Sequence, residues 1–354
     1  MENKGHFSSF WESLGNPRYV VAPMVDQSEL PFRLLCRRYS AHLTYTPMLH
    51  ARIFSENEKY RKTHFQTSED DRPLIAQFCG NDPQTLVNAA RIIKDDVSAI
   101  DINCGCPQGI ARKGKYGAYL LDFPNVITSI VQTVTAQVDI NVTCKIRLVE
   151  KESLQSTLNL CYALEASGCK ALTVHGRDKT EKGVNISDCN WEAIKIIKSR
   201  VGIPGNAPSI LKMSVVIANG GIESLDDVKR CLEYTGADAV MSSEAILEKP
   251  YLFTGREYNN LSIFKEYLSI LKGCPEQRLS SVKSHAFKML HKYLQVHHET
   301  REVIGRAGSI EAFDGIVQDL ERVVAEDSTY SGSWYRRHRK QVTEPLLEES
   351  APAS

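Results

Sequence analysis

The sequence predicts an α/β protein, a closed (β/α)8 TIM barrel followed by a smaller all-helical domain, and three observations lead to this fold. Eight short β-branched runs alternate with segments of helical periodicity. The runs are apolar almost throughout, as strands of a parallel sheet covered on both faces are. Residues with polar or reactive side chains lie at the carboxyl ends of most of these runs, and closure of the barrel brings all those ends onto one face. The alternative, an open doubly wound sheet, would spread them along a line.

The expected strands and helices follow one another through the first 255 residues. The expected strands are Tyr19–Met24, Leu43–Met48, Leu74–Phe78, Ala99–Asn103, Asn141–Arg147, Ala171–His175, Val215–Asn219 and Ala239–Ser243. Between them, apolar residues at helical spacing predict helices over Pro83–Ile93, Asn125–Thr135, Ser153–Ser167, Trp191–Ser199 and Ser224–Tyr234. Ser224 precedes acidic residues, as a helix N-cap does.

After Gly255 the pattern changes to helices alone. We expect them at Ser262–Leu271, Ser280–Gln295 and Ile310–Val324. The predicted organisation is an N-terminal extension at 1–17, a catalytic barrel at 18–255, a helical domain at 256–330, and a basic then acidic tail at 331–354. The composition of that tail predicts disorder.

Composition limits the possible partners. Among 354 residues, Lys+Arg and Asp+Glu are equal at 43 each, so a nucleic-acid partner would need a local basic patch. The ten cysteines are scattered, which is typical of reduced thiols in the cytoplasm or the nucleus. No signal peptide and no apolar stretch of membrane-spanning length is evident, so we expect no membrane association. We also expect a monomer.

The segment C-G-C-P holds the leading candidate for chemistry, Cys106. It follows the apolar run A-I-D-I-N and so lies at the mouth of the fourth expected strand. Cys104 and Cys106 could form half of a metal site, but the nearest further candidates, His297 and His298, belong to the other domain, so we expect no metal. A buried structural thiol is the second interpretation. A thiol held by Gly and Pro at a catalytic face better suits a proton donor or nucleophile.

Further polar residues end neighbouring strands. Lys145 and Arg147 close V-T-C-K-I-R, where an unpaired cation would be costly, so we expect an anionic group to meet them. His175 ends L-T-V-H-G-R in the same way. The segments N-G-G and S-S-E follow the last two expected strands, where barrels commonly bind phosphate through backbone N–H groups.

Taken together, these motifs resemble the tRNA-dihydrouridine synthase family over most of the chain. The shared motifs, in the family's order, are A-P-M-V-D, Q-F-C-G, D-I-N-C-G-C-P-Q, C-K-I-R, V-H-G-R, A-N-G-G-I and V-M-S-S-E-A-I-L-E-K-P-Y-L-F. The segments C-P-Q-G-I-A-R-K-G-K-Y-G-A-Y-L and H-A-F-K-M-L-H-K-Y-L-Q-V-H are similar to the eukaryotic branch that acts on D-loop uridines 16 and 17. Positions 20, 20a and 20b are the alternative targets.

The resemblance implies a flavoenzyme that reduces the C5=C6 bond of uridine in tRNA. FMN would lie over the barrel mouth, with NADPH or NADH as reductant, although no dinucleotide-binding fingerprint is present. Cys106 would deliver the proton to C5. The residues implied for the substrate are Asn103, Arg147 and Arg177. Those implied for FMN are Pro23, Met24, Val25, Gln77, Lys145, His175, Asn219, Gly220, Gly221, Ser243 and Glu244.

For the RNA we expect contacts from the helical domain and the segment after it, where cations interleave with aromatic residues. The candidates are Lys283, His285, Lys288, His291, Lys292 and the run Trp334–Lys340. A solvated helix face is the alternative for each.

One segment departs from the family pattern, an insertion at 205–215 before the seventh expected strand. If it shifted that strand, the phosphate contacts would be lost, and the chain would be a catalytically impaired barrel that only binds tRNA. A flavin dehydrogenase acting on a free pyrimidine is a third possibility, and the helical domain argues against it.

Overall fold

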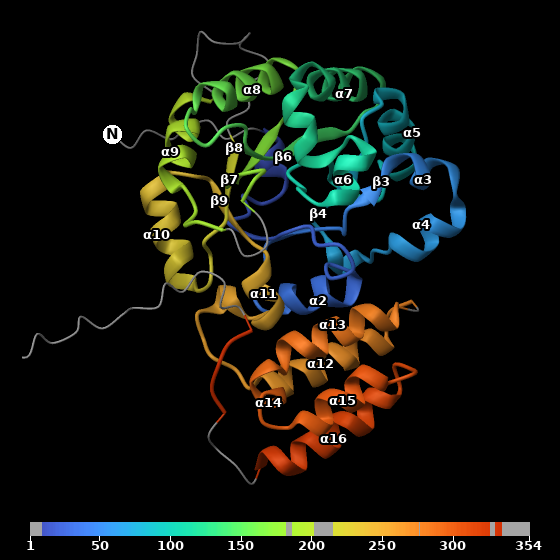
Figure 1. The fold of residues 1–354 in the computed structure, drawn as a ribbon. Helices are drawn as coiled ribbons and strands as arrows, with labels where there is room; N and C mark the ends of the chain where they lie inside the picture. The colour runs from blue at the N-terminus through green and yellow to red at the C-terminus, as the bar shows by residue number, and fades with distance from the viewer. Residues whose placement is uncertain (1–8, 182–185, 202–214, 276, 326–329, 335–354) are drawn as a thin grey trace, which may run out of the picture.

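A closed parallel barrel forms the larger part of the computed structural model, which describes residues 9–181, 186–201, 215–275, 277–325 and 330–334 (Figure 1). Its strands are β1 Tyr19–Val21, β2 Leu43–Tyr45, β4 Leu74–Cys79, β5 Ala99–Cys104, β6 Asn141–Leu148, β7 Ala171–Asp178, β8 Val215–Asn219 and β9 Ala239–Ser242. Each strand pairs in parallel with the next, and β9 pairs with β1, so the sheet closes. The predicted fold class is confirmed, and the open sheet is excluded.

The second expected strand, Leu43–Met48, ends three residues early, at Tyr45. A further short strand that was not predicted, β3 Leu49–His50, pairs with the far end of β4. Pro47 lies between β2 and β3 and has no backbone N–H to donate to a sheet. The first strand also ends three residues earlier than expected, before Pro23.

The inside of the barrel is packed with side chains rather than hollow. Its cluster includes Val20, Leu43, Tyr45, Ile75, Ile217 and Met241, all of them buried. Phe10 and Trp11 of the short helix α1, Ser9–Ser13, belong to the same cluster and are 5% and 1% exposed. The N-terminal extension therefore contributes two aromatic rings to the barrel core, which composition alone did not indicate.

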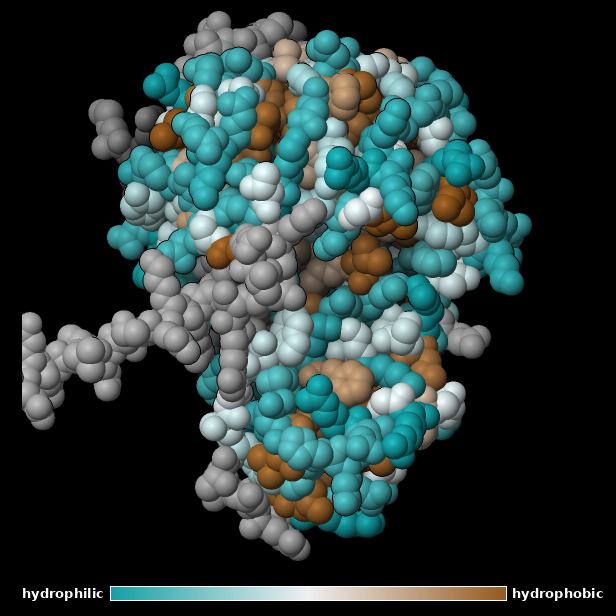
Figure 2. Space-filling view, viewed as in Figure 1, coloured by the Kyte–Doolittle hydropathy of each residue, from teal (hydrophilic) through white to brown (hydrophobic). Residues whose placement is uncertain are grey.

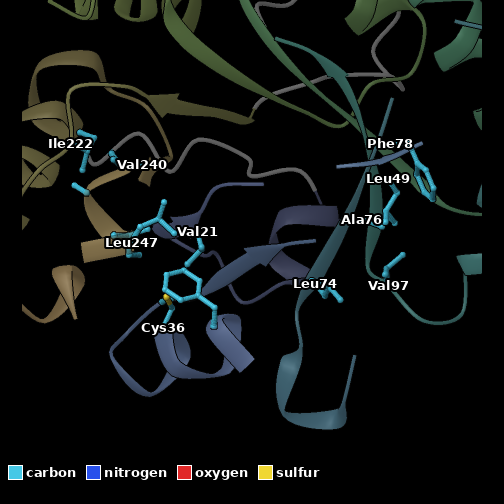
Figure 3. Packing of buried hydrophobic residues seen from close by; sticks show 14 of the residues in the cluster. Val21, Cys36, Leu49, Leu74, Ala76, Phe78, Val97, Ile222, Val240 and Leu247 are labelled. Carbon is cyan, nitrogen blue, oxygen red and sulfur yellow. The ribbon is translucent and has the colours of Figure 1, made fainter. Parts of the chain in front are cut away.

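Helices cover the outside of the barrel and bury its other face. Figure 3 shows apolar residues of this layer, with Val21 near Cys36 and Phe78 near Leu49. Ser224 caps α10 as predicted, its Oγ accepting from the Asp227 N–H. The helices are α2 Leu30–Arg38, α3 Ala51–Glu56, α4 Glu58–His64, α5 Pro83–Ile93, α6 Gly109–Gly114, α7 Pro124–Gln137, α8 Gln155–Ala166, α9 Trp191–Arg200, α10 Leu225–Thr235 and α11 Glu244–Glu248, with 3-10 turns at Glu69–Asp71, Gly117–Asp122 and Leu252–Thr254.

The C-terminal helices form a separate layer below the barrel in Figure 1. They are α12 Asn260–Lys272, α13 Leu279–Met289, α14 His291–Leu294, α15 His298–Arg306 and α16 Ala312–Ala325. The expected helix Ser280–Gln295 is broken at Leu290, whose backbone leaves the helical region, and α15 was not predicted. After α16, residues 330–334 return toward α11.

A polar cluster joins the helical layer to the barrel. Glu29, before α2, accepts hydrogen bonds from the Tyr267 hydroxyl (2.8 Å) and pairs with His285 Nε2 (2.9 Å). His285 is fully buried and stacks on Phe32 at 4.5 Å between ring centroids. Predicting His285 as an RNA contact was therefore wrong, because this ring is part of the interdomain packing.

The face of the molecule seen in Figure 2 is mostly polar, and its apolar side chains lie in separate small patches. Exposed large apolar residues such as Ile110 and Phe123 are scattered along the chain rather than confined to one element. Among the helices that the structure describes, none has both the length and the apolar character needed to cross a bilayer.

Candidate active site at the mouth of the barrel

A cavity of about 560 Å³ opens at the carboxyl ends of the strands, and every site residue nominated from the sequence lines it. A broader hollow of about 790 Å³ lies at the opposite end, between strand starts and helix ends, away from these residues. Size alone therefore does not identify the site. The nominated residues at the mouth are Pro23, Met24, Val25, Gln77, Asn103, Cys106, Lys145, Arg147, His175, Arg177, Asn219, Gly220, Gly221, Ser243 and Glu244.

The loop after β5 turns Cys106, and not Cys104, toward the cavity. Cys104 is the last residue of the strand and fully buried, and burial raises the pKa of its thiol well above the ordinary value. Cys106 is partly exposed. Its N–H donates to Asn103 Oδ1 (3.0 Å), and its carbonyl accepts from the Ala118 N–H (3.0 Å). The structural interpretation of the C-G-C-P thiols thus holds for Cys104, whereas Cys106 is held at both backbone atoms with its side chain available.

Gly117 allows this loop to close. Its φ is +65°, and a Cβ there would lie 2.6 Å from the Cys106 carbonyl oxygen. Any side chain at this position would push the Cys106 backbone away. Within the described residues, no group of three or more His, Cys, Asp or Glu side chains could hold a metal ion.

Lys145 brings a positive charge into the cavity from the middle of β6. Burial and, less strongly, the nearby Arg147 together lower the pKa of its ammonium group to about 8, whereas Asp101 opposes the shift. Among the residues that the structure describes, no hydrogen-bond or ion-pair partner of Lys145 Nζ is found. A buried cation without a partner is costly, so this position favours an anionic or electron-rich ligand.

The two arginines at the mouth brace the loops around the cavity. Arg147 Nε donates to the carbonyl of Gly105 (2.9 Å), and its Nη1 donates to the carbonyls of Asp178 (2.6 Å) and Glu181 (3.1 Å). Arg177 Nε donates to Ser187 O at 2.7 Å. These bonds tie the loop after β7 to the loop that carries Cys106. Backbone carbonyls thus accept the hydrogen bonds of Arg147, and the nearby carboxylates of Glu181 and Asp178 oppose the lowering of its pKa by burial.

His175 is placed by its neighbour Arg177. The Nε2 of His175 lies 3.1 Å from Arg177 Nη1, an atom that can only donate, so Nε2 accepts and the proton of a neutral ring is on Nδ1. On the next strand, Gly220 lies against this ring. Its φ is +105°, and a Cβ would come within 2.8 Å of both His175 Cδ2 and Cys189 Sγ.

The ends of β8 and β9 form the polar wall where the sequence predicts phosphate. Asn219 Nδ2 donates to Met241 O (3.0 Å), which ties the two strand ends together. Trp191, which the sequence analysis did not single out, donates from its indole Nε1 to Gly220 O at 3.0 Å. Gly221 also has a positive φ of +73°. Ser243 precedes α11, so the first turn of that helix faces the same cavity.

The cavity lining includes polar and aromatic residues that sequence reasoning did not place there, among them Gln27, Lys288 and Trp334. Gln27 Oε1 is buried and has no hydrogen-bond partner among the described residues. Lys288, of α13, and Trp334 also line the cavity, and Lys288 Nζ lies 5.1 Å from the centroid of the Trp334 ring. Both had been assigned to RNA contact but not to this cavity. The rest of the basic run, 335–340, lies outside the described residues.

The insertion at 205–215 does not shift the seventh expected strand, which is β8. Residues 205–214 of the insertion lie outside the described part of the chain, but β8 pairs in unbroken register with β7, from Ala171↔Val215 to His175↔Asn219. On its other side, Ile217 pairs with Ala239. Asn219 thus reaches the cavity at the expected depth.

Comparison with known proteins matches the sequence of this chain to a family. The model of dihydrouridine synthases matches residues 20–315. A rat protein, tRNA-dihydrouridine(16/17) synthase [NAD(P)(+)]-like, is 43% identical over 90% of this chain and 70% of its own length. The tRNA-dihydrouridine(16/17) synthase [NAD(P)(+)] of Saccharomyces cerevisiae is 40% identical over 89% of this chain and 76% of its own.

A human tRNA-dihydrouridine(20a/20b) synthase [NAD(P)+]-like protein is 39% identical, but over a shorter 71% of this chain and 75% of its own length. Among solved structures, an old yellow enzyme homologue from Zymomonas mobilis aligns over 66% of this chain and 86% of its own, with a TM-score of 0.47 and 12% identity. This last likeness bears on neither substrate nor cofactor.

Proposed function

Because this chain belongs to the dihydrouridine synthase family, we propose that it reduces uridines 16 and 17 of the tRNA D-loop with FMN and NADPH or NADH. The observation that carries the proposal is the convergence of Cys106, Lys145 and His175 on one cavity at the barrel mouth. The choice of positions 16 and 17 is supported by the rat and yeast relatives, which align over more of this chain than the human 20a/20b relative does.

The cavity residues fit FMN on three counts. Lys145 offers an unpartnered positive charge, which suits the electron-rich N1/O2 edge of reduced flavin. Gln27 Oε1 is an unpartnered buried acceptor, which suits a ring N–H. Gly220 and Gly221 let a phosphate approach the backbone beside Ser243 and the Glu244 N–H. Gln77, His175, Asn219 and the segment Pro23–Val25 complete the predicted contacts.

The chemistry divides between the cofactor and Cys106. Bound FMN would supply a hydride to C6 of the uracil, and the nicotinamide dinucleotide would restore it. Cys106 supplies the proton to C5 as a general acid. Asn103 holds the uracil edge and, through Oδ1, also holds the Cys106 backbone, so one side chain sets the distance between base and thiol. Arg147 and Arg177 act on the substrate by fixing the loops that it must pass.

The target base of the RNA leaves its stack to enter the cavity at the barrel mouth. We assign 18–255 to the FMN-binding barrel and 256–330 to tRNA binding. Trp334 and Lys288 offer a ring and a cation at the cavity, which are the groups that bind single-stranded RNA. The monomeric state and the cytoplasmic or nuclear location stay predictions.

The proposal is tested with Cys106→Ala and a matched variant, Cys274→Ala, whose thiol lies outside the cavity in the helical layer. We expect Cys106→Ala to keep bound FMN and its reduction by NADPH, and to lose dihydrouridine formation by roughly 100-fold or more. Mass spectrometry of unmodified tRNA after incubation measures the product, position by position. Wild-type protein that cannot be loaded with flavin, or that leaves positions 16 and 17 as uridine, would refute the proposal.

A further inference from the structure

A chain of hydrogen bonds runs from the interior of the barrel to the loop of Cys106. Asp101 Oδ2 accepts from Gln77 Nε2 at 2.9 Å, and Gln77 Oε1 accepts from Asn103 Nδ2 at 2.8 Å. Asn103 Oδ1 then accepts from the backbone N–H groups of Gly105 (3.1 Å) and Cys106 (3.0 Å). In both side-chain amides the oxygen faces the loop of Cys106 and the nitrogen faces Asp101, so the chain of hydrogen bonds has a direction.

Neither amide in this chain can set that direction by its shape. The oxygen and nitrogen of an amide have nearly the same size, so Gln77 and Asn103 could each turn by 180° in the same space. Both are buried, at 1% and 8% exposure, so water does not complete a reversed arrangement. The direction is set by the members with only one possible role, and these stand at both ends: the backbone N–H groups of Gly105 and Cys106 can only donate at the outer end.

Asp101 is the corresponding member at the inner end, because an ionised carboxylate accepts hydrogen bonds and cannot donate one. It is fully buried, and its second oxygen accepts from Thr143 Oγ1 at 2.7 Å. Burial raises the pKa of Asp101 to about 6, so the group is mainly ionised at neutral pH. Gln77 must therefore direct Nε2 toward Asp101, which commits its oxygen to Asn103, and the oxygen of Asn103 to the loop.

We propose that Asp101 is a positioning residue of the active site, which anchors the inner end of this chain and through it helps to hold the loop of Cys106 in place. The same chain leaves each amide with an N–H for the cavity, so Gln77 and Asn103 offer donors to carbonyl oxygens of flavin and uracil. The inference rests on the proposed function for its ligands, whereas the ordering of the Cys106 loop follows from the hydrogen bonds alone.

The test replaces Asp101 by Leu and by Asn. Asp101→Leu removes the acceptor of Gln77 Nε2, so the inner end of the chain is no longer anchored. Asp101→Asn keeps an acceptor for Gln77, because Thr143 can accept from the new amide and donate to Ile100 O instead, which lies 3.4 Å away. Thr143→Val is the matched control: it removes the other hydrogen bond to Asp101 but leaves the chain intact.

Two half-reactions are measured separately by stopped-flow absorbance of FMN. In Asp101→Leu we expect reduction of the flavin by NADPH to stay within about 3-fold of wild type, while its oxidation by tRNA slows on the order of 100-fold, as a misplaced catalytic group does. Asp101→Asn and Thr143→Val should keep the wild-type ratio of the two rates within about 5-fold. A purely structural role for Asp101 would instead leave that ratio unchanged in Asp101→Leu.

A second measurement needs neither flavin nor RNA, and so separates this inference from the proposed function. The rate of Cys106 alkylation by iodoacetamide, read by peptide mass spectrometry, should change about 10-fold in Asp101→Leu and remain near wild type in Thr143→Val. If Asp101→Leu does not fold, Gln77→Met breaks the same chain one link later and should give the same change. Equal alkylation rates in all variants, or an Asp101→Asn variant as impaired as Asp101→Leu, would overturn the inference, the latter because charge would then matter rather than the anchoring hydrogen bond.

Discussion

Replacement of Lys145 by Met separates the stability of the barrel from its ability to bind a cofactor. Burial lowers the pKa of Lys145 from 10.5 to about 8. At about 1.4 kcal/mol per pKa unit, keeping this ammonium charged at pH 7 costs the native state about 3 kcal/mol. Part of the side chain is exposed to the cavity, so we expect the flavin-free Lys145→Met variant to be more stable than wild type by about 1–3 kcal/mol.

The sign of the pH dependence provides a sharper test. Between pH 8 and 10.5 the unfolded chain still holds the Lys145 proton whereas the native state has lost it. The unfolded state therefore binds more protons, and the wild-type free energy of unfolding rises with pH in this window. Lys145→Met has no such contribution. The advantage of the variant should be largest at pH 7 and shrink steadily above pH 8.

Urea denaturation of flavin-free protein at pH 7, 8.5 and 9.5, followed by far-UV circular dichroism, measures the difference. Lys59→Met serves as the control, since Lys59 is exposed on α4, and its unfolding free energy should stay within about 0.5 kcal/mol of wild type throughout. The reasoning is refuted if Lys145→Met is less stable than wild type at pH 7, or if its advantage does not change with pH.

The same substitution should weaken FMN binding although it stabilises the fold. An anionic or electron-rich group at Nζ favours the protonated lysine, so FMN affinity of the wild type should fall as pH rises through about 8. Equilibrium dialysis with FMN should show this fall in wild type and a lower, flat affinity in Lys145→Met. Equal FMN affinity in both proteins at pH 7 would place the flavin away from Lys145.

Three further substitutions probe other parts of the site. Gly220→Ala places a Cβ 2.8 Å from His175 Cδ2 at a positive φ, so it should lower thermal stability by more than about 1 kcal/mol and weaken FMN binding, measured by dialysis. Trp334→Ala should weaken tRNA affinity by about 1–3 kcal/mol in filter binding, whereas Tyr234→Ala on the outer face should not. Trp11→Ala should cost about 3–5 kcal/mol of unfolding free energy in urea, since its ring fills the barrel core.

The barrel could be predicted because its signals are local and repeated. Eight apolar runs separated by helical periodicity required no knowledge of distant contacts, and the strand ends placed the polar residues on one face. The early end of the second strand, at Tyr45, was harder to predict from the sequence. The signal was Pro47 inside the expected run, since proline lacks the N–H that a central strand must donate.

What the sequence could not reveal were side chains whose role depends on partners far along the chain. In the sequence His285 is one of several basic residues of a helix. Only its pairing with Glu29, 256 residues away, shows that it is buried. The sequence suggests that Arg147 needs an anionic partner, whereas in the structure three backbone carbonyls accept its hydrogen bonds. Spacing along the sequence carries no information on such partners.

For Asp101 the sequence shows an unusual residue but not the residues through which it acts. Its place in A-I-D-I-N, inside an otherwise apolar strand, signals a buried carboxylate with a purpose, but periodicity points its side chain into the barrel rather than toward a ligand. Only the hydrogen bonds through Gln77 and Asn103 connect it to Cys106. A polar residue directly opposite a site residue on the neighbouring strand, as Asp101 is to Gln77, can thus act through amides that the sequence analysis took for direct ligands.

Two buried charges at the mouth of the barrel are unfavourable for the folded state on their own. Lys145 has no partner among the described residues, and burial lowers its pKa to about 8, whereas burial raises the pKa of the Asp101 carboxyl to about 6. Lys145 lines the cavity, and Asp101 lies just below it, hydrogen-bonded to Gln77. Charges that weaken a fold are retained where a ligand or a reaction uses them, so the position of these two supports the cavity as the functional site.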